Sequence, residues 1–380
     1  MIIILRTMSN SKRNTHMMKA TLGATVITIL FSLLTYVLFM SLQPFSFVQA
    51  LNATDNIQAN KSEISIPSTI SKESQEILKS LRINPPTFVA PGPDDPKGWQ
   101  KLNQQISPLL QMAQPAVDSY HPNITVAELG DVNVLDIRPR DWRDNEKVLV
   151  YLHGGGYTLL SANSTLGTAA TVANSTGLRV ISVDYSLAPF SKWNQTIDEV
   201  ISVIQALKEQ GYSLDDIAMY GDSAGGGLVA GSVLKMRDEG LGIPAALVLW
   251  SPWVDLTGMG DTFFTLKNAD PLPLLTPRLL LAYAAAYANP SDQKNPYVSP
   301  VYGNFSSGFP PTLIQCGTKE VLLSDSVRLY QALDQAGIPV KLDIYEGMPH
   351  VFQTYFFHNT TESDMAISKT NDFLRKYLGY

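Results

Sequence analysis

Short apolar runs that alternate with segments of helical length are the feature that most constrains the fold of this chain. Each run is four to six residues long, and residues 148–152 and 178–183 have the composition of a strand buried on both faces. Repetition of this kind is typical of a mostly parallel sheet with helices on both sides. The predicted strands are residues 148–152, 178–183, 217–220, 245–250, 311–316 and 340–345, and the predicted helices are residues 166–174, 196–210, 224–237, 326–336 and 363–378.

Two features complete this α/β pattern. Gly130-Asp131 separates residues 124–127 from residues 132–137, which predicts an antiparallel hairpin at the start of the sheet. Residues 252–309 interrupt the alternation of strands and helices and contain their own helix near residues 277–287. They are expected to form an insertion that either extends a loop or covers a site. Hydrophobic residues make up 45% of the 380 residues, enough for one large core.

The N-terminal part of the chain departs from this pattern and divides into three segments. Residues 1–19 are basic, and residues 20–42 form an uncharged, mostly apolar stretch. That stretch is long enough to cross a bilayer, which takes about 20 residues, and it also resembles a signal-peptide core, because residues 48–50 look like a cleavage site. Residues 43–79 are polar without a sustained period and are predicted to be a linker. We therefore expect export, with the globular domain either membrane-anchored on the extracytoplasmic or lumenal side or secreted.

Potential glycosylation sites agree with export. The pattern Asn-x-Ser/Thr, an acceptor for N-linked glycans, occurs eight times in the chain. A chain that meets a glycosylation machinery would therefore be a glycoprotein. The acceptor asparagines are Asn52, Asn60, Asn123, Asn163, Asn174, Asn194, Asn304 and Asn359.

Charge and cysteine content exclude several classes of protein. The net charge of −6 gives no reason to expect the basic face that a nucleic-acid partner requires. Cys316 is the single cysteine, so an internal disulfide and a cysteine-based metal site are both impossible.

A serine stands where one predicted strand turns directly into a helix. Gly221-Asp222-Ser223-Ala224-Gly225 follows residues 217–220 and opens the helix over residues 224–237. Such a turn strains its central residue and needs small neighbours, which the glycines provide. It also exposes the hydroxyl at a helix N-terminus, where the dipole favours developing negative charge. Ser223 is therefore the predicted nucleophile.

A glycine-rich turn follows an earlier strand. His153-Gly154-Gly155-Gly156 comes directly after residues 148–152. Glycines let backbone N–H groups approach a reacting carbonyl, and acyl transfer needs such donors at the tetrahedral oxyanion. We predict the N–H groups of Gly154 and Gly155 as donors, with that of Ala224 as the third. The spacings of Walker and dinucleotide-binding loops are absent.

A nucleophilic serine requires a general base, and behind a serine turn of this type the chain order is nucleophile, acid, histidine. The histidines after Ser223 are His350 and His358. His350 follows the strand over residues 340–345, in a loop at the carboxyl edge of the sheet, and is the predicted base. His358 abuts the acceptor Asn359 and is interpreted as a surface or packing residue.

The acid is expected in the loop after residues 311–316. Glu320 stands four residues past that strand, in the loop itself. Asp325 follows Ser324 at the start of a helix, where a carboxylate favours the dipole without any catalytic role. Glu320 is the preferred acid, orienting the imidazole of His350, and Asp325 is the second choice. This chemistry needs no metal or cofactor.

Taken together, these motifs resemble the hormone-sensitive lipase family of α/β-hydrolases, the class IV esterases, from about Gln104 to the C-terminus. The family usually has Asp where Glu320 stands, although members with Glu-x-Leu-Leu there look closely related. Its Tyr-Arg-Leu-Ala-Pro-Glu appears here as Tyr-Ser-Leu-Ala-Pro-Phe over residues 185–190. The resemblance rests on residues 153–157, 183–189, 221–226 and 251–256 and on His350.

The resemblance implies an α/β-hydrolase domain over residues 80–380, with a cap built from residues 80–114 and 252–309. It also implies hydrolysis of short- to medium-chain carboxylic esters, possibly including lactones, so the expected partner is a small-molecule ester. Two alternatives stay open. An amidase or deacetylase would use the same machinery on a poorer leaving group, and a non-catalytic small-molecule receptor would have lost the histidine that is present here as His350.

Overall fold

The computed structural model describes residues 65–81, 87–110 and 114–380. The predicted basic segment 1–19, the predicted anchor or signal core 20–42 and most of the predicted linker 43–79 lie outside these residues. Within the described parts of the chain, no helix combines the length and the apolar character that a bilayer span requires.

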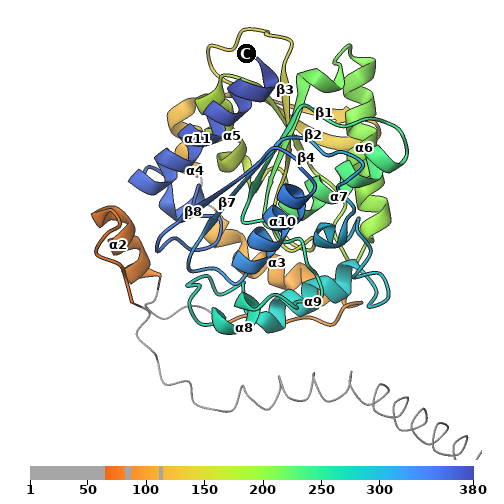
Figure 1. The fold of residues 1–380 in the computed structure, drawn as a ribbon. Coiled ribbons are helices and arrows are strands. Elements are labelled where there is room, and N and C mark those ends of the chain that lie inside the picture. Colours follow the sequence, from red (N-terminus) through yellow and green to blue (C-terminus); the bar gives the residue numbers. More distant parts are fainter. Residues whose placement is uncertain (1–64, 82–86, 111–113) are drawn as a thin grey trace, which may run out of the picture. The chain divides into compact units, whose positions relative to one another are not determined.

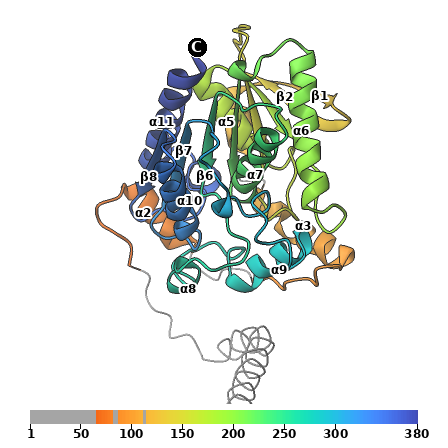
Figure 2. The ribbon, with the colours of Figure 1, turned by 45° about the vertical axis from the view of Figure 1, so that its right-hand side comes forward.

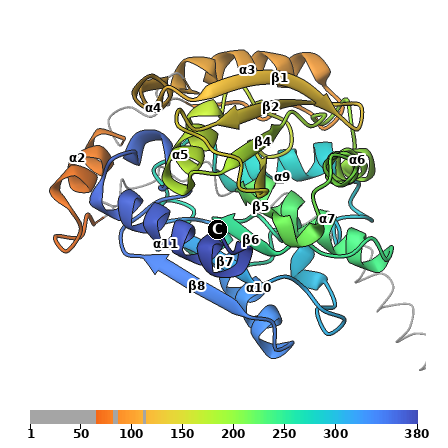
Figure 3. The same cartoon turned by 90° about the horizontal axis from the view of Figure 1, so that it is seen from above.

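A single sheet runs through the described domain (Figure 3). Its eight strands have the order β1-β2-β4-β3-β5-β6-β7-β8. The first two strands form the predicted hairpin, β2 runs antiparallel to β4, and the remaining neighbours are parallel. The strands are β1 (Asn123–Leu129), β2 (Val132–Arg138), β3 (Val148–Leu152), β4 (Arg179–Val183), β5 (Ile217–Asp222), β6 (Ala246–Trp250), β7 (Thr312–Gly317) and β8 (Val340–Tyr345).

Helices cover both faces of the sheet (Figures 1 and 2). In β3, Val148 and Val150 pack into the cluster under α6, α7 and α10, whereas Leu149 and Tyr151 pack into the cluster under α5 and α11. Alternate side chains of a strand point to opposite faces, so a strand covered on both sides must be apolar throughout. These helices are α5 (Leu166–Thr176), α6 (Trp193–Glu209), α7 (Ala224–Asp238), α10 (Leu323–Gln335) and α11 (Thr361–Leu378).

Helices from two distant parts of the chain gather at one end of the sheet (Figure 1). They are α3 (Pro96–Leu110), α8 (Thr262–Thr265) and α9 (Pro277–Tyr287). The rings of Trp99 in α3 and Tyr283 in α9 lie 5.5 Å apart, and Tyr287 stacks on Tyr157 at 3.8 Å. Segments on both sides of the nucleophile in the sequence therefore form one cap. The remaining elements are α4 (Gln114–Tyr120), η2 (Leu214–Asp216), η3 (Pro300–Tyr302) and η4 (Tyr355–Phe357).

The structure corrects the predicted boundary at residue 80. Helix α2 (Lys72–Ser80) lies in the expected linker except for its last residue, and the compact unit begins at Ile64. The carboxylate of Glu362 accepts hydrogen bonds from the backbone N–H of Ser71 at 2.7 Å, from its hydroxyl at 2.8 Å and from the hydroxyl of Ser74 at 2.6 Å. The helix is short, and its partners lie far away in the sequence, so local periodicity did not reveal it.

Candidate active site

Ser223 occupies a strained turn between β5 and α7. Its backbone has φ 54° and ψ −123°, a region that residues with a side chain rarely adopt. Its N–H donates to the carbonyl of Trp250 at 2.8 Å, which ties the turn to β6. A Cβ on Gly225 would lie 2.0 Å from the carbonyl oxygen of Leu152, so only glycine fits there. The flanking glycines therefore permit the turn, as the sequence predicted.

Glu320 and His350 form a buried pair. Nδ1 of His350 lies 2.9 Å from Oε2 of Glu320, and the second carboxylate oxygen accepts the N–H of Gly317 at 3.2 Å. Burial disfavours the charged imidazole, but the hydrogen bond and charge of Glu320 outweigh it, so the pKa of His350 is raised. The pair has the contact expected of an orienting acid and a general base.

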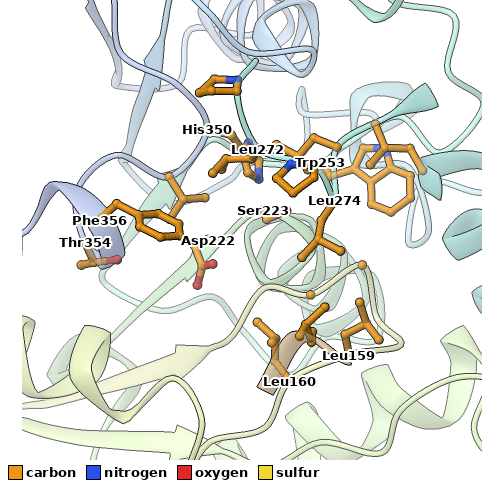
Figure 4. Close-up of a pocket in the computed structure, with 18 of the residues that line it drawn as sticks. Leu159, Leu160, Asp222, Ser223, Trp253, Leu272, Leu274, His350, Thr354 and Phe356 are labelled. Atoms are coloured by element: carbon orange, nitrogen blue, oxygen red, sulfur yellow. The ribbon is translucent and has the colours of Figure 1, made fainter. Parts of the chain in front are cut away.

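The imidazole and the serine face the same cavity. Ser223 and His350 both line a cavity of about 300 Å³ (Figure 4). Nε2 of His350 is buried and has no hydrogen-bond partner among the described residues. With Nδ1–H donated to Glu320, Nε2 carries a lone pair that can accept the serine proton. No hydrogen bond joins it to Ser223, and hydrogen bonds of this kind often tighten only when a substrate binds.

Asp325, the second-choice acid, has a different role. Its Oδ2 accepts the backbone N–H groups of Val254 at 2.9 Å and Asp255 at 2.8 Å, and it makes no hydrogen bond to the histidine. Burial, with a further contribution from the charge of Asp255, raises the pKa of Asp325 to about 8. This carboxyl group fixes the segment after β6.

The prediction that Gly154 donates to the oxyanion is wrong. Its N–H donates to Oδ1 of Asp222 at 3.2 Å, and it does not line the cavity, whereas Gly155 and Gly156 do. The N–H of Ala224 lies in the first turn of α7, where helix geometry supplies no intrahelical partner. Gly155 and Ala224 thus remain candidate donors, and Gly156 joins them.

Asp222 is a site residue whose importance the sequence reasoning missed. Its Oδ1 also accepts the hydroxyl of Tyr151 at 2.6 Å, and burial raises the pKa of its carboxyl group. Asp222 therefore connects the serine turn to the glycine loop through Gly154. Its position directly before the serine, at the variable position of Gly-x-Ser-x-Gly, was the sequence signal that could have identified it as a site residue.

His358 and His153 do not belong to this pair. His358 contacts the hydroxyl of Tyr120 at 3.4 Å and does not line the cavity, so its interpretation as a packing residue agrees with the structure. His153 is fully buried and stacks on Tyr185 at 4.2 Å, and burial lowers its pKa to about 4. A neutral imidazole therefore supports the glycine loop.

Asp270, in the cap insertion, was not predicted as a site residue. Its Oδ1 accepts the N–H of Leu272 at 3.0 Å, while Oδ2 is buried. Burial raises the pKa of Asp270 to about 7, and the charge of His350 opposes that rise. Its position beside the histidine depends on the fold of the insertion, for which the sequence offered no signal.

No group of three or more His, Cys, Asp or Glu side chains in residues 65–81, 87–110 and 114–380 is arranged to hold a metal.

The family comparison agrees with this geometry. A family model described as the alpha/beta hydrolase fold matches residues 149–354, more than half of the chain. This chain belongs to the α/β-hydrolase family. The match spans the glycine loop, the serine turn, Glu320 and His350.

Relatives assign this α/β-hydrolase to the hormone-sensitive lipase group, which confirms the resemblance seen in the sequence. An acetyl-hydrolase of Streptomyces hygroscopicus is 32% identical over 286 residues, covering 74% of this chain and 93% of that protein. The crystal structure of EstE5 soaked with p-nitrophenyl butyrate has a TM-score of 0.72 at 30% identity, covering 82% of this chain and 100% of that one. A crystallised esterase from the bacterial hormone-sensitive lipase family has a TM-score of 0.70 at 30% identity, covering 81% and 99%.

Proposed function

We propose that this α/β-hydrolase cleaves carboxylic esters through an acyl-enzyme formed on Ser223. The observation that carries the proposal is the buried pair of Glu320 and His350, because His350 has an unpartnered Nε2 and lines the same cavity as the strained serine. A serine hydroxyl is a weak nucleophile unless a base removes its proton, and this imidazole is held ready to do so.

The reaction follows from the positions of these groups. Nε2 of His350 takes the proton as the oxygen of Ser223 attacks the ester carbonyl, and Glu320 stabilises the resulting imidazolium. The N–H groups of Gly155, Gly156 and Ala224 hold the oxyanion. The imidazolium then protonates the leaving alcohol. In the second half, His350 removes a proton from water, the hydroxide attacks the acyl carbonyl, and Ser223 recovers its proton as the acid leaves.

The cavity lining favours a hydrocarbon acyl group, and the relatives support a short to medium length. Most of the side chains around the serine are apolar, so they favour a hydrocarbon chain over a charged group. The relative named an acetyl-hydrolase and the neighbour soaked with p-nitrophenyl butyrate agree with acyl groups of this size. The apolar lining includes Ile106, Leu159, Leu160, Leu272, Leu274, Leu275, Leu280 and Phe357.

Hydrolysis of p-nitrophenyl butyrate by Ser223→Ala tests the proposal. We expect kcat to fall by about 10⁴-fold or more while the variant keeps the thermal unfolding of the parent protein. A fluorophosphonate probe should label the parent protein and not the variant. Retained activity or retained labelling in a folded variant would rule out Ser223 as the nucleophile. Matched ester and amide substrates separate an esterase from an amidase, and a non-catalytic receptor would not react with the probe.

We propose also that the chain is exported as a glycoprotein, anchored by residues 20–42 or released by cleavage after them. The basic flank and the uncharged stretch support this. The six acceptor asparagines within the described residues are all exposed, as glycan attachment requires. They are Asn123, Asn163, Asn174, Asn194, Asn304 and Asn359. N-terminal sequencing of the mature protein distinguishes anchor from signal peptide, and an unchanged mass after glycosidase treatment would contradict glycosylation.

A further inference from the structure

The imidazole of His350 is fixed at one end by Glu320, but its backbone lies in the loop between β8 and α11. On the N-terminal side, this loop is held by the loop that carries the acid. The N–H of Lys319 donates to the carbonyl of Met348 at 3.0 Å, and the N–H of Gly347 donates to the hydroxyl of Thr318 at 2.8 Å. The position of the imidazole therefore also depends on the contacts that hold the C-terminal side of this loop.

On the C-terminal side, Val351 adopts a conformation that valine rarely takes. Its φ is 51°, in the left-handed region, where a β-branched side chain is strained. Such a residue persists only when its surroundings hold it. A relaxation of φ at Val351 that ψ of His350 does not compensate would shift the backbone of His350 and so move the imidazole relative to Glu320.

The group that holds this peptide is the hydroxyl of Ser251. The N–H of Val351 donates to Oγ of Ser251 at 3.0 Å, across one hundred residues of sequence, and both side chains are buried. Ser251 is itself held just past β6, because its N–H donates to the carbonyl of Gln315 at 2.7 Å. The hydroxyl is therefore a fixed point, not a mobile surface group.

The same segment also holds the nucleophile. The carbonyl of Trp250 accepts the N–H of Ser223 at 2.8 Å, and the N–H of Trp253 donates to the carbonyl of Ser223 at 2.9 Å. Residues 250–253 thus hydrogen-bond the backbone of the serine on one side and, through Ser251, the loop of His350 on the other. This short segment sets the separation between the two reacting groups.

We propose that Ser251 is a positioning residue for catalysis, whose hydroxyl fixes the peptide between His350 and Val351 and so holds the imidazole between Glu320 and Ser223. The inference rests on the roles proposed above for Ser223 and His350. Ser251 is not among the residues that line the cavity.

The test is Ser251→Ala in the full chain, assayed with p-nitrophenyl butyrate. We expect kcat to fall by about 10- to 100-fold with KM changed by less than about 2-fold, since a small misplacement of a catalytic group slows the chemical step. The pH profile of kcat/KM should shift its lower limb toward lower pH, because a misaligned Glu320 raises the pKa of His350 less. Ser182→Ala is the matched control, since Ser182 in β4 is equally buried and its hydroxyl has no partner among the described residues.

Coupling to Val351 distinguishes positioning from general loss of packing. Glycine adopts a positive φ without strain, so in the Val351→Gly background the added Ser251→Ala change should cost less than about a third of its effect in the parent protein. Additive effects would overturn the proposal. It would also be overturned if Ser251→Ala kept the parent kcat and pH profile. The same holds if active-site titration with a fluorophosphonate showed that Ser251→Ala only reduces the fraction of active molecules, each with the kcat of the parent protein. A parent protein without esterase activity or labelling would refute the proposed function instead.

Discussion

At the residue scale, two neighbouring carboxylates do different work because they have different partners. Glu320 bonds the imidazole of His350, whereas Asp325 bonds backbone N–H groups of the segment after β6. The sequence distinguished them because one stands in a loop and the other at a helix start. It could not reveal that Gly154 uses its N–H on Asp222, because that contact depends on how two distant turns meet.

Glu320→Gln tests the assignment of the acid. The amide preserves the shape of the side chain but loses the charge that orients and stabilises the imidazolium, so kcat should fall by about 10³- to 10⁴-fold. The apparent pKa in the kcat/KM profile should also fall, because the contribution that raises the pKa of His350 is removed. Steady-state rates from pH 5 to 9 measure both effects. Asp325→Asn should stay within about 3-fold of the parent kcat, and an inactive Asp325→Asn variant beside an active Glu320→Gln variant would reverse the assignment.

Asp325 also predicts a pH dependence of stability. Its pKa in the folded protein, about 8, lies above its ordinary value of 3.8, so between these values the folded state binds a proton that the unfolded state has lost. Stability should therefore fall as pH rises across this window. The Asp325→Asn side chain keeps an acceptor oxygen but has no charge, so the variant should not lose this stability as pH rises. The difference in unfolding free energy between the variant and the parent protein should therefore shift in favour of the variant by about 1–3 kcal/mol from pH 5 to pH 8. Urea unfolding at both pH values measures this, and parallel curves would contradict it.

At the scale of elements, the strands were predictable and several helices were not. A strand such as β3 is apolar at every position because both its faces are covered, so its signal is contained in a few adjacent residues. Helix α2 depends instead on Glu362 and on the cluster that includes Leu78, Tyr345, Phe352 and Phe357. Its last residue, Ser80, and the following Leu81 line the cavity. The end of α2 therefore contributes to one wall of the candidate active site, at the start of the segment 80–114 predicted for the cap, whereas the rest of the helix was expected to be a linker.

Glu362→Ala should loosen this wall. Three hydrogen bonds to residues 71 and 74 are lost, and the partly buried donors left behind should cost about 1–3 kcal/mol of local stability. Amide hydrogen exchange in residues 72–80 should accelerate by about 5-fold or more, and KM for the butyrate ester should rise. Glu73→Ala, an exposed change on the same helix, is the control. Unchanged exchange in Glu362→Ala would show that the apolar contacts alone hold α2.

At the scale of the whole molecule, the described domain carries all the groups proposed for catalysis. Its compact unit runs from Ile64 to Tyr380. A chain that begins at Ile64 should therefore fold and keep the parent kcat within about 2-fold, whereas one that begins at residue 82 lacks α2 and exposes the cluster beneath it. The second chain should unfold at a temperature lower by several degrees, on the order of 2–4 °C per kcal/mol for a domain of this size. Differential scanning calorimetry compares them, and equal melting temperatures would show that α2 contributes nothing.

The lining of the cavity has a consequence for the fate of the acylated serine. Walls made largely of leucine and aromatic side chains offer water few hydrogen bonds, so water enters this space at a disadvantage relative to a small alcohol with a hydrocarbon tail. Both nucleophiles can use the same imidazole to attack the acyl group. In mixtures of water and butanol we therefore expect transesterification to exceed the share set by the bulk concentrations of the two acceptors. The ratio of butyl butyrate to butyric acid, followed by gas chromatography, reports how dry the acylated site remains.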